Sequence, residues 1–232
     1  FKALDSEQFE YLAKLMTMSS ADFLDEWFEC DYLKSTMSAS GIIGTFMGPR
    51  SPGSAYVMLH HYMGDIDGAF RAWGFQKGGT GAISMAIARS AEHFGADILT
   101  EAPVKEVKVK NGKAFGVVLN NGDEYNAHKI ISGLDPKLSF LHLLDEKDLP
   151  SDFITSIKNF RIRGSSGKVN LALNGLPDFT CLPGKGHHLH GAISISPSMD
   201  YLEKAYDDAK FGNFSESPYM DIIIPSLLAG HS

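Results

Sequence analysis

Strict alternation of apolar and polar residues is clearest in the middle of the chain, between residues 104 and 126. Valines alternate with lysines over residues 107–110, and the apolar residues of 115–119 fall on one face of the next extended segment. Two Asn-Gly pairs, Asn111-Gly112 and Asn121-Gly122, separate these segments. Asn-Gly tolerates the positive φ angles of a type I′ hairpin turn. The pattern therefore predicts a three-stranded antiparallel meander.

Helical spacing of apolar residues dominates other parts of the chain. Ser19 and Asp22 form a plausible N-terminal capping pair, and Gly95 is a natural stop just beyond a helical pattern. After Ser19 the apolar residues Leu24, Trp27 and Phe28 fall on one helical face, as in a stripe that packs on a core. The segments predicted to be helical are 1–47, 82–94, 137–162 and 198–210.

Short apolar runs bounded by turn residues predict further strands. A glycine-studded and aromatic stretch, residues 64–81, is too irregular for either element and predicts a shaped loop. Helices mixed with strands give an α/β fold, with α+β character from the meander. The segments predicted to be strands outside the meander are 96–101, 128–136, 167–175, 188–196 and 219–226.

Composition and charge exclude several classes of function. The chain has 232 residues, a net charge of −7 and 44% hydrophobic residues, which is ordinary for a globular protein with ample core. An acidic balance argues against nucleic acid and against a polybasic membrane surface. No apolar run is long enough to predict a spanning helix. Cys30 and Cys181 lie far apart and predict free thiols in a reducing compartment, the cytoplasm or an organelle matrix.

The ends of the sequence prompt an expectation about its origin. The chain begins at Phe1 without a signal-peptide pattern, and it ends at Ser232 directly after a strand-like run. We expect it to be a piece of a longer protein or a processed chain.

The run Lys77–Ser84, KGGTGAIS, carries a G-x-G-x-x-S pattern before a predicted helix, and Glu101 ends the following predicted strand. These features are shared with dinucleotide-binding loops. The fingerprint also requires a buried strand directly before the glycines, and residues 70–77 offer none. Glycines that let the backbone approach something closely are the favoured interpretation. An independent nucleotide-binding enzyme that uses this loop directly stays an alternative.

The ordered motifs between Tyr56 and Pro136 resemble the middle of phytoene-dehydrogenase-like FAD-dependent oxidoreductases, within the amine oxidase and carotenoid desaturase superfamily. The shared pattern is an aromatic residue, a Gly-Gly loop, a helix, a Val-rich meander and the IIS-GLDP run at 130–136. The later VNLALNGLPDF and MDIIIPSLL also fit, so the resemblance covers roughly residues 40–230. It implies FAD as cofactor, with a small apolar organic substrate oxidised by hydride transfer to the flavin.

The resemblance also implies residue roles. The residues implied to bind the cofactor are Gly78, Gly79, Gly81, Val104, Ser132 and Gly133. The residues implied to line the substrate space are Tyr56, Trp73 and Phe75. In domain terms, residues 1–74 are the helical part of a substrate domain, 75–150 belong to an FAD-binding domain, and 151–232 supply the sheet and helices of the substrate domain.

The family's primary FAD fingerprint, a strand–GxGxxG–helix near the N-terminus, has no match in this sequence. The alternative is therefore a noncatalytic binding or interaction module that lacks the FAD phosphate loop. Apolar surface left exposed in such a module favours a homo-oligomer or a protein partner.

Histidines supply the remaining candidates. The pair His60-His61 lies in an apolar aromatic stretch, and on a strand adjacent side chains point to opposite faces. Either is a weak candidate for a general base, and a hydrogen-bonded structural histidine is the alternative. His188 and His190 would share a strand face but have no third ligand, and Asp65–Gly68 lacks the later glutamate of a calcium loop. We therefore predict no metal site.

Overall fold

The computed structural model describes residues 4–70, 74 and 76–228. The chain divides into two compact units, one made of residues 1–85 and 163–232 and the other of residues 86–162. Helices are mixed with small sheets, and every strand pair in the described part of the chain is antiparallel. This agrees with the mixed α/β class predicted from the sequence.

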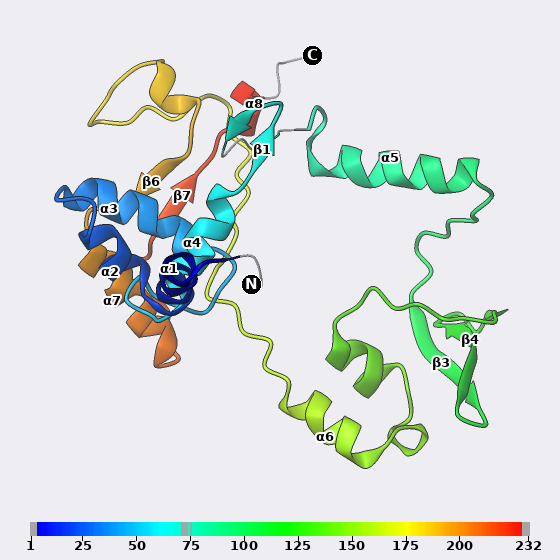
Figure 1. Ribbon diagram of the computed structural model, residues 1–232. Helices are drawn as coiled ribbons and strands as arrows, with labels where there is room; N and C mark the ends of the chain where they lie inside the picture. The colour runs from blue at the N-terminus through cyan, green and yellow to red at the C-terminus, as the bar shows by residue number, and fades with distance from the viewer. Residues whose placement is uncertain (1–3, 71–73, 75, 229–232) are drawn as a thin grey trace. The chain divides into compact units, whose positions relative to one another are not determined.

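Helices form the packed part of the first unit. In Figure 1, α1, α2, α3 and α4 lie against one another, with α7 alongside, and residue contacts join α1 to α4, α2 to α3 and α4, and α3 to α7. Their bounds are α1 Ser6–Thr17, α2 Ser20–Asp25, α3 Asp31–Ser38, a 3₁₀ turn Ala39–Gly41, α4 Ser54–Tyr62 and α7 Met199–Lys210, and a short α8 spans Pro225–Leu228.

Local capping explains where these helices begin. Asp5 and Gln8 form a reciprocal capping box at the start of α1. The predicted pair at α2 is confirmed, because the Asp22 N–H donates to Ser19 Oγ at 3.0 Å. The single helix expected after Ser19 is interrupted, since α2 ends at Asp25 and α3 begins at Asp31. Leu24 is fully buried whereas Trp27 is exposed, so the expected apolar stripe is only partly used.

The core of this unit combines a few apolar side chains with buried hydroxyls. Ala21, Leu24, Met58 and Met199 form the apolar cluster. Beside it lie four serines that are fully buried, and each makes hydrogen bonds. The buried serines are Ser20, Ser35, Ser38 and Ser54.

Ser54 connects three segments through one hydroxyl group. Its Oγ accepts from the Ser20 N–H at 2.8 Å and donates toward the carbonyls of Pro49 and Ser51. Ser35 Oγ donates to the Ser196 carbonyl at 2.6 Å and so ties α3 to the C-terminal part of the unit. Because buried polar groups are costly when unpaired, these bonds fix the segments in one arrangement.

Two short antiparallel strand pairs complete the first unit. β1 (Asp65–Ile66) pairs with β2 (Ala69–Phe70), and Asp67 and Gly68 between them both have positive φ, at 51° and 82°. This is the Asp-Gly type I′ turn, so the segment weighed as a calcium loop is a hairpin connection. β6 (Ile193–Ile195) pairs with β7 (Met220–Ile222).

The second unit contains the predicted meander. β3 (Val104–Lys110), β4 (Lys113–Leu119) and β5 (Glu124–Asn126) form one antiparallel sheet in that order (Figure 1 labels β3 and β4). Asn111 and Gly112 both have positive φ, as a type I′ turn requires. At the second Asn-Gly pair, Gly122 has positive φ but Asn121 does not, and the Gly122 N–H donates to the Leu119 carbonyl. That turn is the type I plus left-handed glycine alternative.

Helical segments flank the meander. The predicted glycine-loop helix is α5 (Gly79–His93), which runs across the boundary between the units, and Gly95 follows it with φ of 89°. Residues 137–162 are broken into a π-helical turn Leu138–His142, a 3₁₀ turn Glu146–Asp148 and α6 (Ser151–Asn159). Phe140 and Phe153 stack edge to face at 4.9 Å, which packs the π-helical turn on α6.

Three of the predicted strands are absent from the structure. Residues 96–101, 128–136 and 167–175 form no strand. Residues 167–175 nevertheless have the alternating sequence pattern of a strand. Ile131 is 92% exposed, so the segment around it is not the buried strand that its composition indicates. Apolar alternation marks a segment that can pair, but pairing also needs a sheet edge in reach. None of the helices in the described ranges is both long and apolar enough to cross a bilayer.

Gly41 offers a test of the serine-lined core. A Cβ at Gly41 would lie 2.8 Å from the Ser54 carbonyl oxygen and 3.2 Å from Ser20 Cβ, both inside the buried region. Gly41→Ala should therefore lower the free energy of unfolding by about 2 kcal/mol, as overpacking does. Urea titration followed by circular dichroism measures this change.

The matched control is Gly191→Ala, where the added Cβ would meet no atom within 4 Å and φ is not positive. Its unfolding free energy should stay within about 0.5 kcal/mol of wild type. Equal stability of the two variants would contradict this account of the core.

Candidate functional site

The exposed face of α4 brings together two of the predicted site residues. Gly53, with φ of 87°, precedes the helix, and the buried face of α4 consists of Ser54, Ala55 and Met58. Tyr56 and His60 lie four residues apart and are both exposed, so they are neighbours on the opposite face. The histidine pair therefore lies on a helix and not on the expected strand.

Apolar side chains surround this pair. Leu59 and Met63 are exposed at the positions that extend the same helix face toward its C-terminal end. The β1–β2 hairpin follows directly in the chain, and its Ile66 and Phe70 are also exposed. We call Tyr56, Leu59, His60 and Met63 the α4 face. It offers one imidazole within an apolar and aromatic surface.

The two adjacent histidines differ in their surroundings. His61 Nδ1 lies 2.9 Å from the Val57 carbonyl one turn earlier, and because a carbonyl only accepts, this nitrogen carries the proton. The His60 ring packs edge to face on the His61 ring, with 5.5 Å between centroids. His61 thus matches the structural alternative, and His60 is the histidine that faces outward on the α4 face.

The glycine loop leads into α5. Gly78 and Gly79 have φ of 83° and 76°, a region where residues with side chains are strained, so the backbone itself explains these two glycines. Gly81 lies inside α5 without positive φ, and a Cβ there would meet no atom within 4 Å. Nothing in the part of the chain that the structure describes requires glycine at 81. Trp73 and Phe75, predicted to line the substrate space, lie outside the described residues.

The other predicted cofactor residues belong to the second unit. Val104 is the first residue of β3 and pairs with Leu119. Ser132 Oγ lies 2.7 Å from Ser139 Oγ and accepts from the Leu134 N–H at 3.3 Å. Gly133 is open on the side where a Cβ would project. Gly78, Gly79 and Gly81 belong to the first unit. The cofactor role of both sets of residues stays a prediction.

A cluster that the sequence did not indicate lies on the β6–β7 strand pair. Ser194 and Asp221 are direct partners in the ladder, and the hydroxyls of Ser194 and Tyr219 donate to the two carboxylate oxygens of Asp221. Burial, reinforced by the hydrogen bond to Asp221, raises the pKa of Tyr219 well above its usual value. Only the strand register brings these residues together, because they are up to 27 positions apart.

The remaining candidates from the sequence are the pair His188 and His190, a metal site and the two cysteines. His187–Leu189 form a 3₁₀ turn and not a strand, so His188 and His190 do not share a strand face. Within the described ranges, no three His, Cys, Asp or Glu side chains converge in a way that could hold a metal ion. Cys30 and Cys181 are free and exposed.

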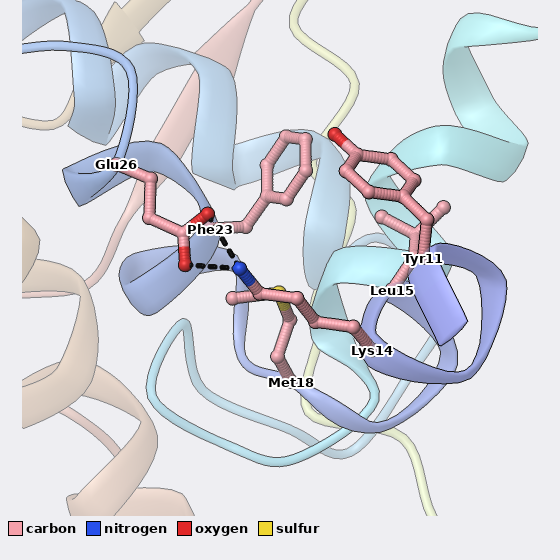
Figure 2. Close-up of a pocket in the computed structure, with 6 residues that line it drawn as sticks. All are labelled: Tyr11, Lys14, Leu15, Met18, Phe23 and Glu26. Atoms are coloured by element: carbon pink, nitrogen blue, oxygen red, sulfur yellow. Dashed lines mark hydrogen bonds and ion pairs between the residues drawn. The ribbon is translucent and has the colours of Figure 1, made fainter. Parts of the chain in front are cut away.

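A shallow hollow near α1 contains none of the predicted residues (Figure 2). Lys14 and Glu26 form an ion pair at 2.6 Å across it, and Phe23 and Tyr11 stand above the pair. The hollow is open to solvent and encloses no space that a small-molecule ligand could fill. It is therefore a surface depression between α1 and α2.

Comparison with known proteins decides the family. The model of the family described as flavin containing amine oxidoreductase matches residues 8–211. The chain belongs to this flavin-containing amine oxidoreductase family. The family predicted from the motif order between Tyr56 and Pro136 is thereby confirmed. No solved structure matches the chain.

Individual relatives refine the family position. The chain is 37% identical over 222 residues to pyridine nucleotide-disulfide oxidoreductase domain-containing protein 2 of Rattus norvegicus, and 36% identical to the Mus musculus protein of the same name. It is 29% identical over 151 residues to prolycopene isomerase 1, chloroplastic, of an Oncidium hybrid cultivar, covering 65% of this chain and 24% of the isomerase.

The two rodent relatives are much longer than this family member. Their alignments cover 93% of this chain but 38% of the relatives' length. The chain therefore spans about two fifths of these proteins, and the match includes the α4 face, the glycine loop and the meander.

Alkaline titration tests the Tyr219 environment. A raised pKa means that folding favours the neutral phenol, so this stabilisation is complete below the ordinary tyrosine pKa of about 10 and is lost as pH rises above it. Between about pH 10 and 11.5, wild type should lose unfolding free energy more steeply than Tyr219→Phe. Thermal unfolding at stepped pH measures both slopes.

Tyr32→Phe, which removes the hydroxyl of an exposed ring, is the control and should keep the wild-type slope. If Tyr219→Phe shows the wild-type slope instead, the described hydrogen bonds of Tyr219 do not form in solution.

Proposed function

We propose that the chain is the central part of an FAD-dependent, phytoene-dehydrogenase-like oxidoreductase that oxidises an apolar organic substrate. The observation that carries this proposal is the family match over residues 8–211, a range that includes the α4 face and the glycine loop. One relative is a prolycopene isomerase, and prolycopene is a hydrocarbon. The apolar surroundings of His60 suit a substrate of that chemical class.

The glycine loop fits an approach by the flat ring system of a flavin. At Gly79 and Gly81 the space that a Cβ would enter is open, so backbone atoms can be reached there. When bound, FAD would supply the hydride acceptor that the protein itself lacks. Val104, Ser132 and Gly133 are the residues of the second unit proposed to hold the cofactor.

The α4 face has a different proposed task. Tyr56, Leu59 and Met63 would contact the apolar substrate and exclude water from it. His60, exposed on the same face, would hold or accept a proton at its imidazole. His61 would support this arrangement because its Nδ1–H is fixed on the Val57 carbonyl and its ring packs against that of His60.

Gly81→Ala separates a structural from a cofactor role for this glycine. In the isolated chain the substitution should stabilise α5 by about 1 kcal/mol, because alanine is the better helix former. In the full-length parent protein the same methyl group should weaken flavin binding at least about tenfold, close to 1.4 kcal/mol. Urea unfolding measures the first effect, and the visible flavin absorbance of the purified parent measures the second.

Gly191→Ala is the control, since its Cβ also meets nothing and it lies outside the proposed flavin surface. It should leave the flavin content unchanged. A parent protein that is colourless and ignores added FAD would overturn the proposed function, and normal flavin content in Gly81→Ala would overturn the role given to the loop.

The isolated chain should bind FAD only weakly. It contains no strand–GxGxxG–helix, the element whose helix N-terminus supplies the pyrophosphate contacts in dinucleotide sites. Isothermal titration of the 232-residue chain with FAD should give no submicromolar binding. Tight binding would instead favour the nucleotide-binding enzyme that uses residues 77–84 directly.

A further inference from the structure

Residues 167–173, which we call the strap, have the sequence pattern of a strand but no sheet. Val169, Leu171 and Leu173 alternate with polar or small residues and are 80%, 74% and 61% exposed. No backbone group of the strap makes a hydrogen bond within the described structure. Alternating apolar side chains and free backbone groups together define a segment ready to join a sheet edge.

The strap is held at its N-terminal side. Ser165 Oγ donates to the Thr45 carbonyl at 3.1 Å, and the Arg163 guanidinium lies 5.8 Å from the centre of the Phe46 ring. On the C-terminal side, Asp178 accepts from the Gly184 N–H at 2.7 Å. The N-terminal flank is therefore anchored, the Asp178–Gly184 bond closes a local turn, and residues 167–173 between them are unpaired. The loop-closure entropy that a new strand normally costs is already partly offset by the N-terminal anchor.

The β6–β7 strand pair of the same unit has the complementary features. Its apolar face consists of the cross-strand pairs Ile193–Ile222 and Ile195–Met220, which matches the apolar face of the strap. The opposite face carries Asp221, the single charge of these two strands, and Lys168 is the single charge of the strap. If the strap lay beside these strands, apolar side chains would meet on one face of the sheet, and Lys168 would share the other face with Asp221.

One edge of this strand pair is the better acceptor. At the end of β6, the Ser196 carbonyl is already bonded to Ser35 Oγ of α3, and Ser196 is buried. On β7, residues Met220–Ile222 make no backbone hydrogen bonds except those of the ladder with β6. Asp221 also belongs to β7. We propose that the strap closes onto the free edge of β7 as a third strand, with Lys168 and Asp221 on the same face.

Hydrogen exchange and nuclear Overhauser effects on the full chain test the proposal. In the closed state alternate amides of residues 168–173 should exchange about tenfold more slowly than in a synthetic peptide of residues 163–178. Amide and α-proton contacts should link the strap to Met220–Ile222. Peptide-like exchange throughout the strap, or contacts to β6 in place of β7, would overturn the proposal.

Matched variants separate the two faces of the strap. Leu171→Asn removes the central apolar contact and should return exchange to the peptide rate. Ala172→Asn places the same amide on the opposite face and should retain the protection. The exchange rates of α1–α4 serve as an internal check that both variants are folded. Equal exchange in the two variants would contradict strand formation.

Concentration dependence distinguishes closure within one chain from pairing between two copies. Protection and contacts that are independent of protein concentration, with a monomer by sedimentation, support closure onto β7 of the same chain. Protection that appears only as dimers form would overturn the proposal and make the strap an interface between copies.

Discussion

The helical unit depends on the fully buried hydroxyl of Ser54, which joins α4 to backbone groups of α2 and of the loop that contains Pro49 and Ser51. Its oxygen accepts a hydrogen bond from the Ser20 N–H at the start of α2 and lies within hydrogen-bonding distance of the Pro49 and Ser51 carbonyls. Water cannot replace these partners, so the loop before α4 has one position relative to α2. That position sets the rotation of α4, and the rotation leaves Tyr56 and His60 exposed.

The small size of the residues in this core is as necessary as their hydrogen bonds. Gly41 lies so close to the Ser54 carbonyl that no side chain fits, and Ala21 and Ala55 are buried nearby in α2 and α4. Small residues allow backbones to approach, and hydroxyl groups then satisfy the polar atoms brought inside. The unit is therefore stabilised by close contact more than by the number of large apolar side chains.

Large apolar side chains are instead prominent on surfaces. α5 has no buried residue, and Ile83, Ile87 and Phe94 are exposed along it. The strap likewise exposes its apolar side chains, Val169, Leu171 and Leu173, which alternate as in a strand. Exposed apolar surface of this kind marks a place where something binds or packs. For α5 this agrees with the much greater length of the two rodent relatives, and for the strap a partner of suitable chemistry lies within the same unit.

The sequence by itself determined the elements whose causes are local. The meander, α7 and α5 follow from periodicity, Asn-Gly turns and a stop at Gly95, all of which act over a few residues. The family also followed from the sequence, because the order of weak motifs is kept. Tertiary structure decided the rest. His60 and His61 lie in a helix because Gly53 and the buried Ser54 begin one. The Ser194–Asp221–Tyr219 cluster forms only because the register of β6 and β7 places Ser194 opposite Asp221. The predicted strand at 167–175 is unpaired in the structure because apolar alternation supplies one half of a sheet, and hydrogen-bonding partners elsewhere in the chain must supply the other.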